Sequence, residues 1–205
     1  MFEHVQKRRA AEEAARRAGR LPAGQSLTAE GKWPVLHEGP IPAFDRASWD
    51  FRIWSREGLV AERRLGYDEL LAVAPARLQT DFHCVTTWSK LDMTWEGVRV
   101  KDLLAATAID PRARVVMVHA EHGYTANVPL DDLRRDEVML ASRVDGADLA
   151  PEHGYPLRLV VPHLYAWKSV KWVRGFELLA RDRPGYWEQR GYHMRGDPWK
   201  EERYG

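Results

Sequence analysis

The single cysteine of the chain, Cys84, is the residue whose type and surroundings best suit chemistry. It lies in the segment 81–88, whose sequence is DFHCVTTW. A lone cysteine cannot form an intrachain disulfide bond or complete a zinc site that needs paired cysteines. It can be a small buried apolar side chain, or a thiolate that acts as a nucleophile or as a ligand of a soft metal. The histidine before it and the hydroxyls and indole after it favour the thiolate.

A Cys/His hydrolase is one form of the thiolate hypothesis. Such an enzyme needs hydrogen-bond donors that stabilise an oxyanion. No glycine-rich turn follows Cys84, and Val85 makes its surroundings apolar. These features favour a metal ligand over a hydrolytic nucleophile.

Two lysines, Lys168 and Lys171, lie three residues apart in the segment 165–172, YAWKSVKW. With Ser169 and Trp167 they could bind a phosphate and stack on a planar ring. The alternative is the edge of a strand with solvated lysines. Taken alone, the segment favours that alternative.

A third polar segment, 152–158, has the sequence EHGYPLR. It places His153 at a Gly-Tyr-Pro turn and Arg158 at the start of an apolar strand. An arginine beside a buried strand usually pairs with a carboxylate or a phosphate. The segment therefore indicates either a structural ion pair or an anion site.

A zinc site is a further alternative, in which His119 and His122 would join His83, Cys84, His153 or His163. His119 and His122 end a predicted strand, where their side chains would face opposite sides. That placement disfavours zinc. The chain also lacks a P-loop, a GxGxxG fingerprint and a nucleophile elbow.

The composition limits the remaining classes of function. The chain has 205 residues, a formal net charge of +1, 44% hydrophobic residues and 9 tryptophans. A charge so near zero does not favour nucleic acid or an anionic membrane as a partner, and the tryptophans could line a rigid pocket. No apolar run approaches the roughly 20 residues of a membrane span. The N-terminal segment has no apolar export signal, so we predict a cytoplasmic protein with a reduced thiol.

The elements that must position these residues mix strands and short helices without strict alternation, which predicts an α+β fold of mixed sheets. Residues 1–31 are predicted to form an N-terminal helix (3–18) and an extended arm, and 32–205 a single domain. The pattern predicts strands at 49–54, 78–85, 114–119, 124–128, 138–144, 157–161 and 172–180, with 95–100 a strand or turn. It predicts helices at 67–73, 101–106 and 129–133.

The polar segments occur in a characteristic order along the chain. His-x-Gly-Pro begins at His37, Cys84 follows, His-Gly-x-Pro-x-Arg begins at His153, and Lys-x-x-Lys-Trp begins at Lys168. This order resembles the molybdopterin-binding domain of the sulfite oxidase family, over roughly residues 32–205. The tail segment 191–199, GYHMRGDPW, is also similar to that family.

The resemblance implies a molybdenum-molybdopterin cofactor (Mo-MPT) without an added nucleotide. Cys84 then matches the cysteine that ligates molybdenum and takes part in catalysis. The resemblance implies cofactor binding by side-chain or main-chain atoms of the following residues: His37, His83, Cys84, Thr86, His122, His153, Arg158, Trp167, Lys168, Ser169 and Lys171.

Departures from the sulfite oxidase pattern bear on the substrate. Ser142 stands where those enzymes have a catalytic tyrosine, Val35 or Leu36 and Trp88 stand where they have sulfite-binding arginines, and Lys90 is the nearest cation. We therefore expect oxygen-atom transfer with a small substrate other than sulfite, or a cofactor-binding module without turnover of its own. No haem domain is evident, so we expect a separate electron-transfer partner, for which the N-terminal helix is a candidate docking element.

Overall fold

The computed structural model describes residues 2–205, with side chains from residue 5 onward, and its regular structure is dominated by two sheets. The six-stranded sheet has the order β1-β5-β8-β10, with β4 paired to β5 and β9 to β8. Its strands are β1 (Ser26–Leu27), β4 (Pro75–His83), β5 (Trp88–Arg99), β8 (Met139–Val144), β9 (Ala147–Asp148) and β10 (Arg158–Val160). All of its pairings are antiparallel except the parallel pair β1–β5.

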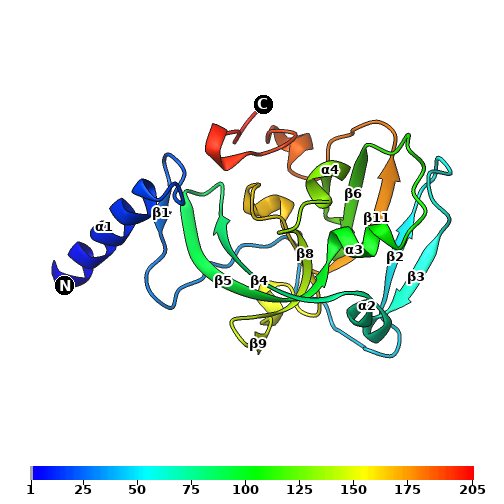
Figure 1. The fold of residues 1–205 in the computed structure, drawn as a ribbon, viewed down its shortest axis with the longest axis horizontal. Coiled ribbons are helices and arrows are strands. Elements are labelled where there is room, and N and C mark those ends of the chain that lie inside the picture. The colour runs from blue at the N-terminus through cyan, green and yellow to red at the C-terminus, as the bar shows by residue number, and fades with distance from the viewer. Residues whose placement is uncertain (1) are drawn as a thin grey trace.

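The five-stranded sheet has the order β3-β2-β11-β6-β7. Its strands are β2 (Asp50–Trp54), β3 (Arg63–Gly66), β6 (Val115–Ala120), β7 (Thr125–Pro129) and β11 (Val173–Leu179). Only the β2–β11 pair is parallel. Figure 1 shows this sheet on the right, with the β4–β5 hairpin on the left.

The helices are short apart from the first. They are α1 (Phe2–Arg17), α2 (Tyr67–Val73), α3 (Val100–Ala105) and α4 (Leu130–Leu133). Single 3-10 turns follow the strands: η1 (Glu121–Gly123), η2 (Pro151–His153), η3 (Ala166–Lys168), η4 (Glu188–Arg190) and η5 (Pro198–Lys200). Within residues 2–205, no helix is both long and apolar enough to span a membrane.

The main hydrophobic core lies where both sheets turn apolar side chains toward each other. Because side chains alternate along a strand, Phe51 and Ile53 of β2 enter this core together, and Phe176 of β11 packs on Phe51. Val98 of β5 and Leu140 of β8 enter it from the other sheet. The alternate residues of β5 and β8 enter a second cluster that contains Phe82, Met93, Trp95 and Met139. Phe82 of this cluster lines the candidate site described below.

The α+β class of mixed sheets is confirmed, and most predicted elements are found within a few residues of their expected bounds. The segment 95–100, predicted to be a strand or turn, belongs to a strand that begins earlier than expected. The segment 95–100 is the end of a long strand, β5, that already begins at Trp88. The first half of β5 has an irregular burial pattern, with Asp92 exposed at a positive φ of 58°, so it lacks the alternation by which a strand is recognised in a sequence. It pairs with β4, with a register shift between Thr80 and Phe82. Cys84 therefore lies in a tight turn of a hairpin rather than in a longer loop.

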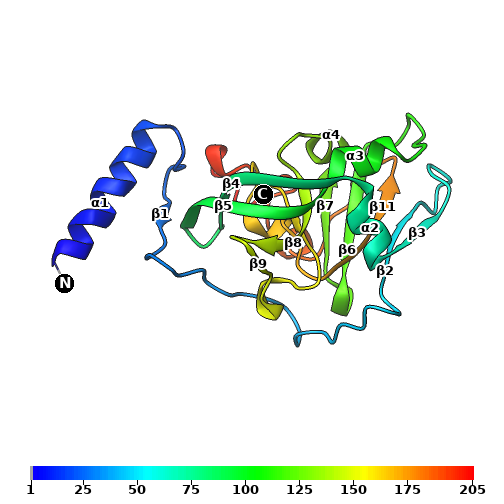
Figure 2. The ribbon, with the colours of Figure 1, turned by 60° about the horizontal axis from the view of Figure 1, so that its bottom comes forward.

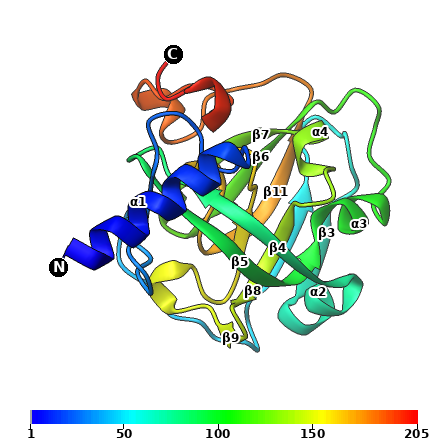
Figure 3. The same ribbon diagram turned by 60° about the vertical axis from the view of Figure 1, so that its left-hand side comes forward.

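The N-terminal segment contributes to the sheet as well as extending away from it. Figure 2 shows α1 projecting from the body of the molecule, and Ala15 is its one buried residue among those whose side chains are described. The arm that follows supplies β1, which pairs with the first residues of β5. In Figure 3 the β4–β5 hairpin runs from the region of α1 toward α2 and α3.

Candidate active site

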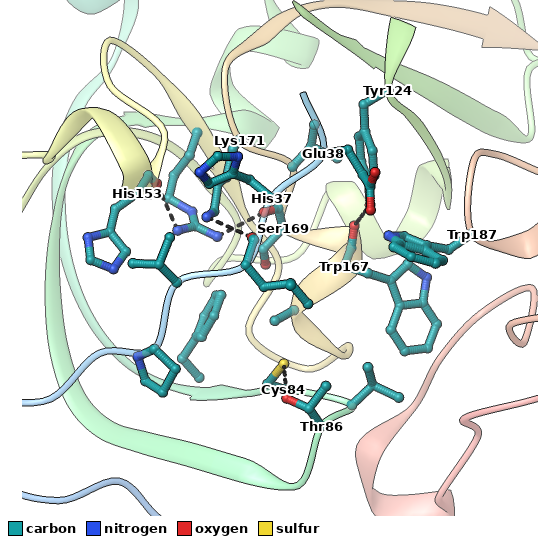
Figure 4. Close-up of a pocket in the computed structure, with 18 of the residues that line it drawn as sticks. His37, Glu38, Cys84, Thr86, Tyr124, His153, Trp167, Ser169, Lys171 and Trp187 are labelled. Atoms are coloured by element: carbon teal, nitrogen blue, oxygen red, sulfur yellow. Dashed lines mark hydrogen bonds between the residues drawn. The ribbon is translucent and has the colours of Figure 1, made fainter. Parts of the chain in front are cut away.

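A cavity of about 400 Å³ opens beside the turn that carries Cys84. A volume of this size suits a small-molecule or cofactor site. An irregular strap formed by residues 33–38 borders it, and residues near β10, η3 and the C-terminal tail complete its walls. Figure 4 shows the sulfur of Cys84 facing the cavity, with His153 and Lys171 on one side and Trp167 and Trp187 on the other. Residues that are distant in the sequence therefore meet around one thiol.

The turn between β4 and β5 fixes the direction of Cys84. The amide of Cys84 donates to the carbonyl of Trp88 at 2.8 Å, and the amide of Thr87 donates back to the carbonyl of Cys84 at 3.1 Å. Thr87 adopts a positive φ of 72°, which a threonine rarely takes outside a tight turn. The Sγ atom lies 3.2 Å from Oγ1 of Thr86, so the hydroxyl can donate to a thiolate. Cys84 is only 8% exposed, and its visible surface belongs to the cavity.

Arg158, the first residue of β10, is a buried cation that lines the cavity. Its guanidinium has no carboxylate partner in the described chain. It is 2% exposed, and its Nη1 and Nη2 atoms donate to the carbonyls of His153 at 2.9 Å and Ser169 at 3.0 Å. Its Nε atom has no partner within the described structure. Burial lowers the pKa of Arg158 to about 9, which still leaves the guanidinium charged at neutral pH.

Lys171 provides a second cation in the same part of the cavity. Its Nζ atom donates to the carbonyls of Leu36 at 2.9 Å and Glu152 at 2.7 Å. Burial, and then the charge of Arg158, lower the pKa of Lys171 to about 7. No ion pair of either cation with a carboxylate occurs among residues 5–205. The cavity therefore holds one buried and one half-buried cation without an acidic partner in this part of the chain, a pair that suits an anionic ligand.

His153 lines the cavity next to these cations and stacks on Trp33 of the strap. The two rings lie 3.7 Å apart at an interplanar angle of 10°. Burial is the main cause that lowers the pKa of His153, so the imidazole is neutral near pH 7. Such a flat aromatic pair beside an anion site suits a ligand with a planar polar ring.

Aromatic side chains form the opposite wall. Trp167 and Trp187 both pack on Tyr192, with ring centroids 5.1 Å and 5.0 Å away. Tyr124 donates its hydroxyl to the carbonyl of Trp167 at 2.8 Å, and burial raises the pKa of Tyr124 well above its usual value. This wall therefore holds a fixed, protonated phenol among indoles.

Most of the residues expected from the sequence meet at this cavity. The structure brings together His37, Cys84, Thr86, His153, Arg158, Trp167, Ser169 and Lys171. Sequence reasoning assigned no role to several other lining residues, which are Trp33, Glu38, Tyr124, Trp187 and Tyr192. The high tryptophan count hinted at indole walls but did not say which indoles form them.

Three of the expected cofactor-binding residues do not line the cavity, namely His83, His122 and Lys168. His83 points to the other side of β4, where its Nδ1 atom lies 2.8 Å from Oγ of Ser89 and burial lowers its pKa to about 4. His122 has a φ of 58° and is exposed, with its ring against Gly39, the residue after the strap. A direct side-chain contact of these two histidines with a ligand in the cavity does not follow from their positions.

The side chain of Lys168 belongs to a buried structural network. Its Nζ atom donates to Oδ1 of Asn127 at 2.8 Å and to the carbonyl of Met194 at 2.7 Å, and it forms an ion pair with Glu188. Glu188 also accepts from Nε1 of Trp167 at 2.8 Å. The lysine thus fastens the C-terminal tail to β7, and only its main chain is near the cavity.

The residues that replace the family's sulfite-binding arginines do reach the site. Val35, Leu36 and Trp88 all line the cavity, whereas Lys90 and Ser142 do not. Ser142 is buried on β8. Among the described residues, no group of three His, Cys, Asp or Glu side chains is placed to hold a metal ion, so the zinc alternative has no support in the structure.

Comparisons with known proteins agree with this geometry. The family model of the oxidoreductase molybdopterin binding domain matches residues 38–187, and the chain belongs to this family of molybdopterin-dependent oxidoreductases. It is 43% identical over 189 residues to the uncharacterized oxidoreductase YuiH of Bacillus subtilis, with 91% of this chain and 93% of that protein covered. It is 28% identical over 158 residues to the protein-methionine-sulfoxide reductase catalytic subunit MsrP of Gluconobacter oxydans, with 66% and 50% covered.

The fold is also similar to that of a solved molybdenum-family structure. The sulfane dehydrogenase SoxCD from Paracoccus pantotrophus superposes with a TM-score of 0.65 and 21% sequence identity, covering 77% of this chain and 44% of that chain. The chain thus spans nearly all of the Bacillus relative but only about half of the MsrP and SoxCD chains.

The residues present fit the cofactor of this family. Arg158 and Lys171, which have no carboxylate partner among the described residues, suit its phosphate, and the stacked pair of Trp33 and His153 suits its planar pterin. The thiol of Cys84 is of the soft donor type that molybdenum would accept. The donor set therefore agrees with molybdopterin in both charge and shape.

Proposed function

We propose that this protein binds molybdenum through Cys84 and carries out oxygen-atom transfer on a small substrate other than sulfite. The observation that carries the proposal is the juxtaposition of one thiol, aimed into the cavity, with two cations, the buried Arg158 and the half-buried Lys171, that have no acidic partner within residues 5–205. A thiolate and a dianionic phosphate would compensate those charges. When bound, the molybdenum cofactor supplies two-electron redox chemistry.

In this proposal the residues of the chain bind the cofactor and orient it. Arg158 and Lys171 would hold the phosphate through charge-assisted hydrogen bonds, and Ser169 and His153 would contact the pterin. The Thr86 hydroxyl would donate to the thiolate of Cys84. Trp88 and the aromatic wall would exclude water, which strengthens each of these electrostatic contacts.

The apolar side chains at the rim of the cavity support a substrate of low charge. Val35 and Leu36 place exposed apolar side chains at the rim, where 44% and 68% of their surfaces are accessible. The lining residues Trp33 to Leu36 carry no charged side chain, so they would not compensate a dianion such as sulfite for the hydration that it loses at this rim. A neutral oxygen donor or acceptor, such as the sulfoxide named for the MsrP relative, fits this rim better.

Electrons would then come from or go to a separate protein, for which α1 is a candidate docking helix because most of its described surface is exposed. The cytoplasmic location expected from the sequence stays a prediction. A cofactor-binding module without turnover is the second candidate function, favoured by the absence of the arginines and of a tyrosine at Ser142.

The decisive experiment compares the wild-type protein with Cys84→Ser, both made in cells that synthesise molybdopterin. We expect about one molybdenum and one pterin per wild-type chain, and pterin with little or no molybdenum in Cys84→Ser. Metal content and pterin fluorescence report this directly. Equal molybdenum in both proteins would refute ligation by Cys84. Cofactor without any reaction with a sulfoxide or N-oxide under a viologen reductant would instead support the module without turnover.

A further inference from the structure

The turn that carries Cys84 is held by a residue that lies far away in the sequence, Gln25 of the N-terminal arm. Gln25 is 1% exposed, and its Nε2 atom donates to the carbonyl oxygen of Cys84 at 3.0 Å. Its Oε1 atom accepts from Oγ of Ser89 at 3.2 Å. One buried side-chain amide therefore joins Cys84 to the start of β5, and its nitrogen and its oxygen each form a hydrogen bond.

The chemistry of the partners fixes the orientation of this amide. A backbone carbonyl can only accept, so the nitrogen of Gln25 must face Cys84. The hydroxyl of Ser89 then donates to the amide oxygen, and Ser89 accepts from Nδ1 of His83, 2.8 Å away. His83, expected from the sequence to contact the cofactor, is instead part of the support behind the cysteine turn.

Backbone contacts of the arm add to this support. The amide of Ser26 donates to the carbonyl of Thr87 at 2.9 Å, and the amide of Thr28 donates to the carbonyl of Ser89 at 3.0 Å. From the other end of the chain, the guanidinium of Arg203 donates to the carbonyl of Val85. The turn from Cys84 to Thr87 thus has three of its carbonyls held by segments outside the matched family region 38–187.

We propose that Gln25 is a positioning residue that sets the direction of the Cys84 thiol toward the cofactor. The turn needs support from outside because few of its own contacts hold it. It contains only one internal hydrogen bond to the carbonyl of Cys84, and Thr87 has an unfavourable positive φ. A second donor on the same carbonyl restricts rotation of the peptide plane next to the Cα atom that carries the thiol. The proposal rests on the proposed role of Cys84 as molybdenum ligand.

The test uses the lone cysteine as its own reporter in the full-length, cofactor-free protein. Gln25→Met keeps the length of the side chain and removes both hydrogen bonds. The matched control is Arg20→Met, which removes the ion pairs of the same arm with Asp81 and Asp92 but leaves the Cys84 carbonyl untouched. The measurement is the rate of alkylation of Cys84 by iodoacetamide, followed by intact mass.

We expect Gln25→Met to raise the alkylation rate about two- to tenfold, the factor that corresponds to one net hydrogen bond. In Arg20→Met, Cys84 should be alkylated at the wild-type rate. This should hold even if the substitution lowers the melting temperature as much as Gln25→Met does. An unchanged rate in Gln25→Met, or an equal rise in both variants, would overturn the proposal, because Gln25 would then only stabilise the arm.

A second readout uses the cofactor-loaded protein. Gln25→Met should bind the pterin but show a shifted thiolate-to-molybdenum absorption band and lose the metal faster during dialysis, whereas Arg20→Met should match the wild type in both. A wild-type spectrum and wild-type metal retention in Gln25→Met would overturn the proposal. If the wild-type protein itself took up no molybdenum, the proposed function would fail, while the alkylation rates would still decide whether Gln25 orients the thiol.

Discussion

Arg158 and Lys171 share one side of the cavity, where the guanidinium helps to lower the pKa of the ammonium to about 7. Both side chains donate to backbone carbonyls, and neither forms an ion pair with a carboxylate of the described chain. The two like charges repel each other, and binding of a phosphate dianion beside both groups would relieve that repulsion.

Replacing Arg158 by methionine should separate cofactor binding from stability. The substitution removes a buried charge, which favours the folded state, but it also leaves the carbonyls of His153 and Ser169 without a donor, which costs about 1–3 kcal/mol each when they are fully buried. These effects oppose each other, so we expect a modest change in the free energy of unfolding. Pterin content should fall at least about tenfold, since the loss of one charge-assisted pair is worth that much. Urea denaturation and pterin fluorescence measure the two quantities.

The pKa of Lys171 predicts a pH-dependent affinity for anions. In the cofactor-free protein this pKa is about 7, and a bound dianion raises it. Above pH 7, binding must therefore take up a proton, and the affinity should fall by up to about tenfold for each pH unit. Sulfate is a suitable probe, because its own charge does not change between pH 6 and about 8.5. Calorimetry should show the fall in wild type and a flat profile in Lys171→Met. A flat wild-type profile would mean that Lys171 does not face the anion.

Lys168, although it lies in the same motif, should behave as a structural residue. Lys168→Met leaves the carboxylate of Glu188 buried without its ion pair, which should cost about 3–5 kcal/mol in the free energy of unfolding. The double substitution Lys168→Met with Glu188→Gln should recover part of that loss. Sulfate affinity of the folded fraction should stay close to wild type in both. Loss of sulfate binding with unchanged stability would return Lys168 to the cofactor site.

The contrast between Lys168 and Lys171 shows where sequence reasoning reached its limit. The family resemblance implied cofactor binding for both lysines, but only Lys171 lines the cavity. Their different directions depend on the 3-10 turn Ala166–Lys168 and on partners in the tail, Glu188 and Met194, which no local pattern reveals. The direction of the His122 ring could not be predicted for a similar reason, since it follows from the positive φ of His122, which places the ring beside Gly39.

The elements of the fold were easier to predict than the walls of the site. Alternation and apolar runs identified β2, β6, β8 and β11, because the same periodicity that buries one face of a strand is visible in the sequence. The aromatic wall could not be found in this way. Tyr124 follows η1, whereas Trp187 and Tyr192 flank η4 in the C-terminal tail, and these two segments meet only through tertiary packing. Gln25 was invisible for the same reason, since its partner Cys84 is 59 positions away.

The apolar rim predicts how selectivity against sulfite could be reduced. Leu36 is 68% exposed at the cavity, so an arginine has room there and would add a cation where the sulfite oxidases place one. In the cofactor-loaded protein, Leu36→Arg should lower the KM for sulfite severalfold at low salt, and 0.5 M salt should abolish most of the gain, because such a charge is strongly screened. Sulfite oxidation with ferricyanide as acceptor measures this. Leu36→Gln, which has similar reach without the charge, is the control, and reduction of a neutral sulfoxide should change little in either variant. Equal KM values for Arg and Gln would show that charge at this rim does not determine the substrate.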